Sequence, residues 1–152
     1  MMADYLSLQK RVLYISAEEG TDLAFVDACK RAGLDSKNRS IQFLEYITIE
    51  DLMIKLAKRN AANIVFVDNV TVYNDELKYG KFKELLNKFP NKLFVFIAHE
   101  ERKEPYTSTA KLIKKLAKVI AHVVGLSAQI YGRVPGGTLI IDEFKATLYH
   151  GE

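Results

Sequence analysis

The sequence has few of the residues that build disulfide frameworks and zinc sites. Its 152 residues include one cysteine, Cys29, and three histidines. One cysteine cannot form an intramolecular disulfide, and a lone cysteine with three scattered histidines cannot supply the ligands of a zinc finger. Both kinds of framework are therefore excluded, and Cys29 is expected to pack within a helix rather than act as a nucleophile.

Long hydrophobic runs are also lacking. The apolar runs at residues 64–67 and 93–98 fall far short of the roughly 18 residues that a membrane helix needs. The first residues show no basic segment followed by an apolar one, which is the pattern of a secretory signal. We therefore expect a cytoplasmic protein that has no membrane partner.

Proline and glycine are scarce, at three and eight residues, and no stretch of the chain has the composition of a linker. Hydrophobic residues make up 49% and charged residues 27%, which is typical of a folded globular protein. A chain of this length usually forms one core. The sequence therefore predicts a single domain over residues 1–152.

The net charge of +3 is too small to indicate a nucleic-acid partner, but it is unevenly distributed. Residues 1–76 carry 9 basic and 12 acidic side chains, whereas residues 77–152 carry 13 and 7. The second half is therefore the candidate for contact with a polyanion. A chance cluster of solvated lysines explains the same distribution equally well.

Short apolar runs alternate with longer amphipathic stretches, which is typical of an α/β fold. The runs at 64–67 and 93–98 are apolar throughout, so we expect strands that are covered on both faces. Thr48 stands where it can cap a helix, with Asp51 three residues later. The pattern predicts strands at 12–15, 41–44, 64–67 and 93–98, and helices at 22–32, 48–60, 76–89 and 108–120.

The C-terminal part of the chain lacks this alternation of strands and helices. Residues 122–133 and 138–149 are expected to be extended, with a turn at 134–137 that contains Pro135 and two glycines. The whole pattern predicts a three-layer α/β sandwich, in which a mostly parallel sheet is followed by a C-terminal antiparallel hairpin.

Polar side chains follow three of the expected strands directly. Glu18 and Glu19 come after the first, Asp68 comes after the third, and His99 comes after the fourth. The carboxyl ends of parallel strands meet at one edge of a sheet, where ligands collect. We therefore expect these side chains to form one polar site.

The same segments resemble the RecA-like ATPase core, in the branch that includes RecA, the RadA/Sms repair proteins and the DnaB-type replicative helicases. Residues 12–35, which begin VLYISAEEG, resemble the second strand of that core and the helix after it. Residues 63–69, NIVFVDN, resemble its Walker B strand, and residues 93–101, LFVFIAHEE, resemble its sensor strand. The resemblance covers nearly the whole chain.

This resemblance implies roles for the residues at the strand ends. Glu18 would activate the attacking water, Asp68 would hold Mg²⁺, and His99 would report the γ-phosphate to a DNA-binding loop. That loop would correspond to residues 100–109. Lys145 would lie near the position from which some members offer a basic finger to the neighbouring subunit.

One part of the family pattern is missing. No G-x-x-x-x-G-K-[ST] motif occurs, although this loop supplies the backbone N–H groups and the lysine that hold a triphosphate. The family places the loop, together with a central strand, just before the point where this chain begins. We therefore expect Mg²⁺ and ATP to bind only if the loop is supplied in trans. The missing strand would leave one edge at 93–98 and another on the strand after residue 121, and we expect these edges to pair together, to recruit the N-terminus or to accept another chain.

Nucleic-acid contacts are expected in two places. The helix at 108–120 carries lysines on one face that could line a phosphate backbone, and the loop after His99 carries two further cations. A solvated helix face is the simpler reading of the lysines. The candidate residues are Lys111, Lys114, Lys115, Lys118, Arg102 and Lys103.

Three functions are therefore open. The first is a partial or degenerate RecA-like ATPase domain that serves DNA recombination, repair or replication, and that is inactive alone but completed by a partner ATPase subunit or another copy. The second is a non-catalytic module that binds nucleic acid or a partner protein. The third is an unrelated magnesium-dependent phosphoesterase.

Overall fold

The computed structural model describes residues 2–34, 38–102 and 104–142. The chain divides into two compact units, Met1–Lys111 and Leu112–Glu152, here called unit 1 and unit 2. A single domain over the whole chain stays a prediction.

Unit 1 is built on a four-stranded parallel sheet with the strand order β2-β1-β3-β4. Val12 lies opposite Ile41 on one side and Ile64 on the other, and Ile64 lies opposite Leu93. The expected α/β class and parallel sheet are confirmed. The strands are β1 (Val12–Ser16), β2 (Ile41–Leu44), β3 (Ile64–Asp68) and β4 (Leu93–Phe96).

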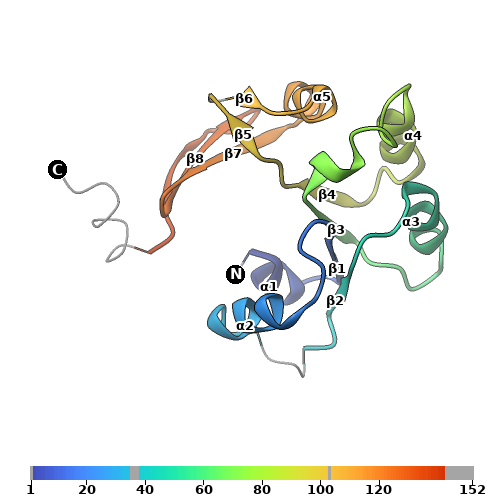
Figure 1. The fold of residues 1–152 in the computed structure, drawn as a ribbon, viewed down its shortest axis with the longest axis horizontal. Coiled ribbons are helices and arrows are strands. Elements are labelled where there is room, and N and C mark those ends of the chain that lie inside the picture. Colours follow the sequence, from blue (N-terminus) through green and yellow to red (C-terminus); the bar gives the residue numbers. More distant parts are fainter. Residues whose placement is uncertain (1, 35–37, 103, 143–152) are drawn as a thin grey trace. The chain divides into compact units, whose positions relative to one another are not determined.

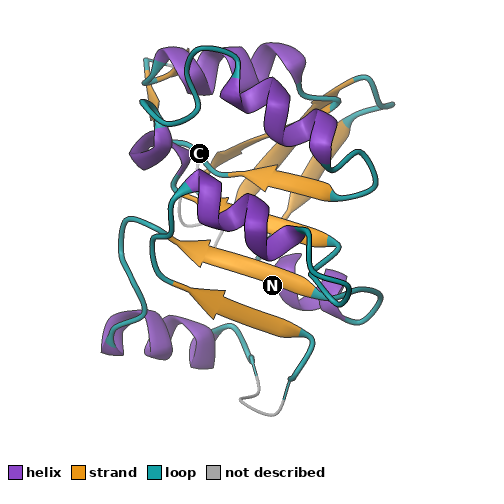
Figure 2. Ribbon diagram, turned by 90° about the vertical axis from the view of Figure 1, so that its right-hand side faces the viewer, coloured by secondary structure: helices purple, strands orange, loops and turns teal. Residues whose placement is uncertain are grey.

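Helices cover both faces of this sheet, so unit 1 has three layers. Helices α1 (Met2–Ser7) and α2 (Leu23–Arg31) lie on one face, and α3 (Ile49–Leu56) and α4 (Lys81–Lys88) lie on the other (Figures 1 and 2). Because side chains alternate along a strand, the apolar strands supply both layers of the core. Ala3 of α1 packs with Val12 and Phe66, and the ring of Phe82 of α4 lies 5.5 Å from that of Phe96.

Helix α3 begins as its sequence predicts. The hydroxyl oxygen of Thr48 accepts a hydrogen bond from the Asp51 N–H, with an N–O distance of 3.1 Å. The helix ends at Leu56, although the sequence favoured residue 60. The four residues from 57 to 60 are exposed, so no apolar burial stabilises a further turn.

The helix expected at 76–89 is wrong in its first half, since α4 begins only at Lys81. The backbone at Tyr79 and Gly80 takes positive φ angles of 51° and 89°, which interrupt a right-handed helix. The Glu76 carboxylate accepts a hydrogen bond from the Ile49 N–H at 2.8 Å, so it caps α3 instead. A short 3₁₀ helix, η1 (Val70–Tyr73), precedes this segment.

The two strands expected to be buried on both faces differ. β3 meets the expectation, since Ile64–Val67 are all buried. β4 does not, because Leu93 is 48% exposed and the other three residues are only half-buried. The reason is position, because β4 is the last strand of the sheet in the described part of unit 1 and pairs there with β3 alone.

Unit 2 contains a three-stranded antiparallel sheet instead of the expected two-stranded hairpin. Helix α5 (Ser108–Leu116) spans the boundary between the units and ends before residue 120. The segment expected as one extended stretch turns at Gly125, whose φ is 57°. The strands are β7 (Val119–Val124), β8 (Ser127–Gly132) and β9 (Gly137–Ile140).

The chain turns between the end of β8 at Gly132 and the start of β9 at Gly137, so the turn expected at residues 134–137 is confirmed. Gly132, at the end of β8, has a φ of 120°, and a Cβ atom there would lie 2.6 Å from the carbonyl oxygen of Lys118. That oxygen accepts a hydrogen bond from the Arg133 N–H at 2.7 Å. Only glycine fits this close approach of two backbones.

Two short elements lie between β4 and α5. β5 (Glu100–Glu101) and β6 (Glu104–Pro105) pair antiparallel as a small ribbon. Within the described ranges, no helix has both the length and the apolar character to span a membrane.

Candidate functional site

The carboxyl ends of β1, β3 and β4 bring the predicted site residues together. These strands are neighbours in the sheet, so the side chains that follow them reach one edge. They surround a cavity of about 200 Å³. The residues that line it are Ser16, Glu18, Glu19, Asp68 and His99.

Glu18 is held by two hydrogen-bond partners. Its Oε2 accepts a hydrogen bond from Nδ2 of Asn69 at 2.9 Å, and Nε2 of His99 lies 3.0 Å from the same oxygen. The Asn69 amide and, to a lesser extent, His99 lower the pKa of Glu18 below its usual value. Glu18 is therefore an oriented carboxylate near neutral pH, and with a side chain 49% exposed it is accessible to water.

Asn69 positions Glu18, a role that was not predicted from the sequence. The side chain is 2% exposed, and its Oδ1 accepts a hydrogen bond from the Thr71 N–H at 2.8 Å. That bond caps η1 and fixes the direction of the amide. The signal available in the sequence was an amide directly after Asp68, at the end of a buried strand.

Asp68 is the last residue of β3 and lies opposite Ser16 of β1. Its Oδ2 accepts a hydrogen bond from the hydroxyl of Tyr14. Burial, followed by the bond to Asp68, raises the pKa of Tyr14, so the hydroxyl remains a donor. Tyr14 was not among the residues predicted for the site, although the two-residue period of β1 and β3 places Tyr14 and Asp68 on the same face.

The carboxylates at the cavity could bind a metal ion only if a substrate and water supply its other ligands. Across the described ranges, no three His, Cys, Asp or Glu side chains are grouped as metal ligands. Mg²⁺ commonly takes one or two carboxylates together with substrate phosphates and water. Asp68 fits the role of such a carboxylate, and Glu19 lines the same cavity.

The lysines expected on one face of the helix at 108–120 do not all lie on α5. Lys111 and Lys115 are exposed one turn apart on α5, whereas Lys114 is half-buried. Lys118 lies beyond the end of α5, so the expected face of four lysines is wrong.

The cation Arg102 in the loop after His99 is also poorly placed to contact a phosphate backbone. Arg102 lies in the β5–β6 turn with a φ of 52°, among Glu100, Glu101 and Glu104, which would repel a phosphate backbone. Lys103 and Lys145 lie outside the described residues.

The arrangement at the carboxyl edge therefore joins an oriented carboxylate, Glu18, with a histidine and a strand-end acid, Asp68. Such a set can orient a water molecule and hold a divalent cation next to it. When the chain is compared with known families and with curated proteins, no family model and no curated protein matches it.

Proposed function

We propose that the chain is a partial RecA-like ATPase domain, connected with DNA recombination, repair or replication. It hydrolyses nucleotide only when another segment supplies a phosphate-binding loop. The observation that supports this proposal is the meeting of Glu18, Asp68 and His99 around one cavity. That cavity lies at the carboxyl edge of a parallel sheet, where α/β proteins bind their ligands.

The contacts of each site residue indicate its role in the proposed reaction. Glu18 accepts a hydrogen bond from the attacking water and takes its proton, since its two partners keep it ionised. Asp68 would hold the magnesium ion that accompanies the phosphates, and that ion would supply positive charge to neutralise them. His99 contacts Glu18 directly, so a change of position at His99 changes the orientation of Glu18.

The cavity also explains the dependence on another segment. Its described lining includes the carboxylates of Glu18, Glu19 and Asp68 and no lysine or arginine. A triphosphate would meet like charge there, and one Mg²⁺ ion does not replace the backbone N–H groups and lysine of a phosphate loop. Affinity for Mg-ATP is therefore weak in this chain alone.

The open edge of β4 is where the missing part would join. Phe94, Val95 and Phe96 are half-buried, and Ile97 beyond them is 38% exposed. A parallel strand added at this edge would cover them and would end next to His99, at the cavity. The added strand would come from a partner ATPase subunit or another copy. In a completed oligomer, Lys145 would act across the subunit interface.

The first test maps nucleotide contact on the isolated chain by NMR. We expect amide shifts on addition of Mg-ATP at residues 16–19, 68–69 and 99, and saturation only at high nucleotide concentration. Asp68→Asn should remove the magnesium-dependent part of these shifts. Glu101→Gln serves as the control, because Glu101 is an exposed acid that does not line the cavity.

The second test supplies the missing part. A strand, a G-x-x-x-x-G-K-[ST] loop and a helix are fused ahead of Met1, and ATP hydrolysis is measured. We expect turnover in the fusion and its loss in the Glu18→Gln fusion. Hydrolysis of a simple phosphate ester by the chain alone would instead indicate the phosphoesterase. Absence of any nucleotide contact at the cavity would indicate a binding module.

A further inference from the structure

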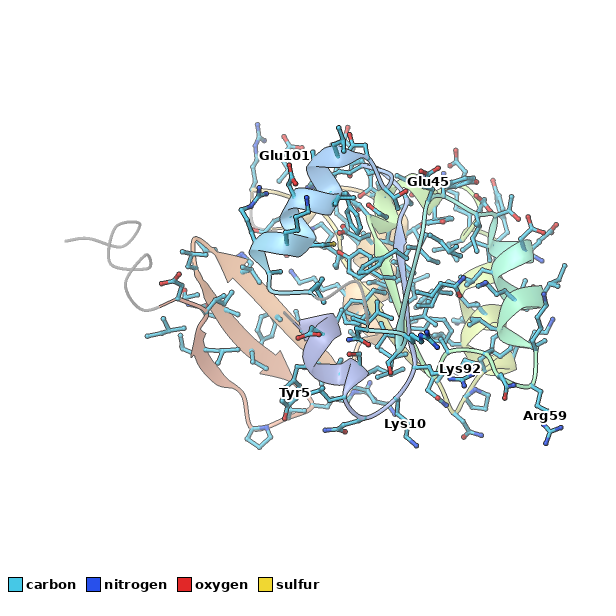
Figure 3. All side chains as sticks on the ribbon, turned by 90° about the horizontal axis from the view of Figure 1, so that it is seen from below. Tyr5, Lys10, Glu45, Arg59, Lys92 and Glu101 are labelled. Carbon is cyan, nitrogen blue, oxygen red and sulfur yellow. The ribbon has the colours of Figure 1, made fainter. Side chains whose placement is uncertain are left out.

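At the amino-terminal edge of the sheet in unit 1, the loops before β1, β3 and β4 carry charged side chains of one sign. The loops at residues 8–11, 57–63 and 89–92 precede β1, β3 and β4, which are neighbours, so the three loops lie at one edge. Figure 3 shows Lys10, Arg59 and Lys92 at one end of unit 1, with Glu45 and Glu101 at the opposite end.

We call this surface the basic edge. It has six cationic side chains, and residues 8–11, 57–63 and 86–92 contain no aspartate or glutamate. Five of the six are exposed and one, Lys92, is half-buried. The six are Lys10, Arg11, Lys58, Arg59, Lys88 and Lys92.

Hydrogen bonds tie the three loops to one another. The Asn63 N–H donates to the carbonyl oxygen of Arg11 at 3.0 Å, and the Leu93 N–H donates to that of Asn63 at 2.9 Å. The Arg11 guanidinium donates to the carbonyl oxygen of Asn60 at 2.9 Å, and the Lys92 ammonium donates to that of Ala62 at 2.6 Å. The three loops are therefore held to one another, and two of the six cations, Arg11 and Lys92, are held in place by their own hydrogen bonds.

Helix termini account for only part of this charge. Helices α1, α3 and α4 end at this edge, and cations are favourable near the C-terminus of a helix. This effect is confined to the last turn, which explains Lys88. It does not explain Lys58 and Arg59, which follow the C-cap Ala57, or Lys10 and Arg11, which follow the end of α1.

We propose that the basic edge binds the phosphate backbone of a nucleic acid. Amide side chains lie between the cations, at Gln9, Asn60, Asn63 and Asn91, and such groups donate hydrogen bonds to phosphate oxygens. The ammonium groups of Lys88 and Lys92 each lie over the Phe89 ring, 6.0 Å from its centroid. Cations, amides and an aromatic ring together are the groups that contact single-stranded nucleic acid.

This surface differs from the one that the sequence indicated. The expectation rested on the basic second half of the chain, yet Lys10, Arg11, Lys58 and Arg59 belong to the acidic first half. The fold separates the charges by edge, not by position along the chain. The basic edge also lies at the end of the sheet opposite the cavity, so it stands independently of the proposed ATPase site.

The test measures binding of the whole chain to fluorescent single-stranded and duplex DNA over a series of salt concentrations. The variant Lys10→Gln, Lys58→Gln, Arg59→Gln removes three exposed cations from the basic edge. Each lost phosphate contact lowers the slope of log affinity against log salt by about 0.7 for single strands and about 0.9 for duplex. For three lost contacts we therefore expect the slope to fall by about two for single strands and by nearly three for duplex, together with a loss of affinity at low salt.

A matched control removes three exposed lysines elsewhere, in the variant Lys83→Gln, Lys111→Gln, Lys115→Gln, and should keep the wild-type slope. Circular dichroism checks that both variants fold. Polyglutamate should displace DNA poorly. The proposal is overturned if the two variants lose affinity equally, if the wild type shows no salt-dependent binding, or if polyglutamate competes as well as DNA does.

Discussion

The orientation of the Glu18 carboxylate depends on side chains that are distant in the sequence. The sequence placed a glutamate at the end of a strand, and such a residue alone could equally be a solvated acid at the start of a helix. Its two partners come from segments 51 and 81 residues away, at Asn69 and His99. They convert an ordinary surface acid into an oriented carboxylate.

The pKa of Glu18 provides a prediction at this scale. Asn69→Asp replaces the donor amide with a second carboxylate but keeps an oxygen for the Thr71 N–H, so the pKa of Glu18 should rise. His99→Gln should raise it less, because His99 is the smaller of the two causes. Carboxyl ¹³C chemical shifts across a pH titration measure both changes. An unchanged Glu18 midpoint in Asn69→Asp would contradict the arrangement.

The lowered pKa of Glu18 also determines the pH range in which its contacts stabilise the fold. The folded-state pKa of Glu18 is lower than its unfolded value, so its contacts stabilise the fold at pH values above the unfolded pKa. This contribution is lost as the pH falls through the lowered folded-state pKa. Because the side chain is half exposed, solvent keeps the contribution small.

At the scale of elements, helix starts were more predictable than helix ends. Thr48 caps α3 as its sequence predicted, because capping needs only a side-chain oxygen within three residues. The beginning of α4 could not be found in this way. Glu76 looks like the start of a helix, but its carboxylate is bound to α3, a contact that is not local in sequence.

The Thr48 cap gives a prediction for α3. Thr48→Ala should lower the free energy of unfolding by about 1 kcal/mol, because the Asp51 N–H loses its acceptor. Thr48→Ser retains the hydroxyl and should remain close to the wild type. Urea denaturation followed by circular dichroism measures both variants. Equal stability of the alanine and serine variants would show that the cap contributes nothing.

At the scale of the whole molecule, burial is unequal between the two units. β1 and β3 contribute almost entirely buried residues to unit 1. In the described part of unit 2, only Ile113 and Ala128 are buried, and every residue of β9 is exposed. Elements with few buried apolar contacts open at a lower free energy.

Hydrogen exchange can therefore distinguish the units. We expect the slowest amide exchange in β1 and β3, and faster exchange throughout β7, β8 and β9. Mass spectrometry of peptic fragments resolves these segments. Equal protection in both units would instead indicate one cooperative domain, as the sequence predicted, because all strands would then open together.

The sequence by itself determined what depends on near neighbours. The two-residue period and apolar runs located four parallel strands, and Thr48 located the start of α3. The polar residues after those strands identified the edge that gathers Glu18, Asp68 and His99. These features follow from local backbone preferences and from the rule that parallel strands end at a common edge.

Tertiary structure alone decided what depends on distant neighbours. Among the described strands β4 pairs with β3 alone, so an apolar run that looked buried in the sequence is half exposed in the fold. The partners of Glu18 and Asp68, which are Asn69 and Tyr14, followed from the arrangement of side chains at the sheet edge. The basic edge arose in the same way, since three loops far apart in sequence meet only when parallel strands align their starts.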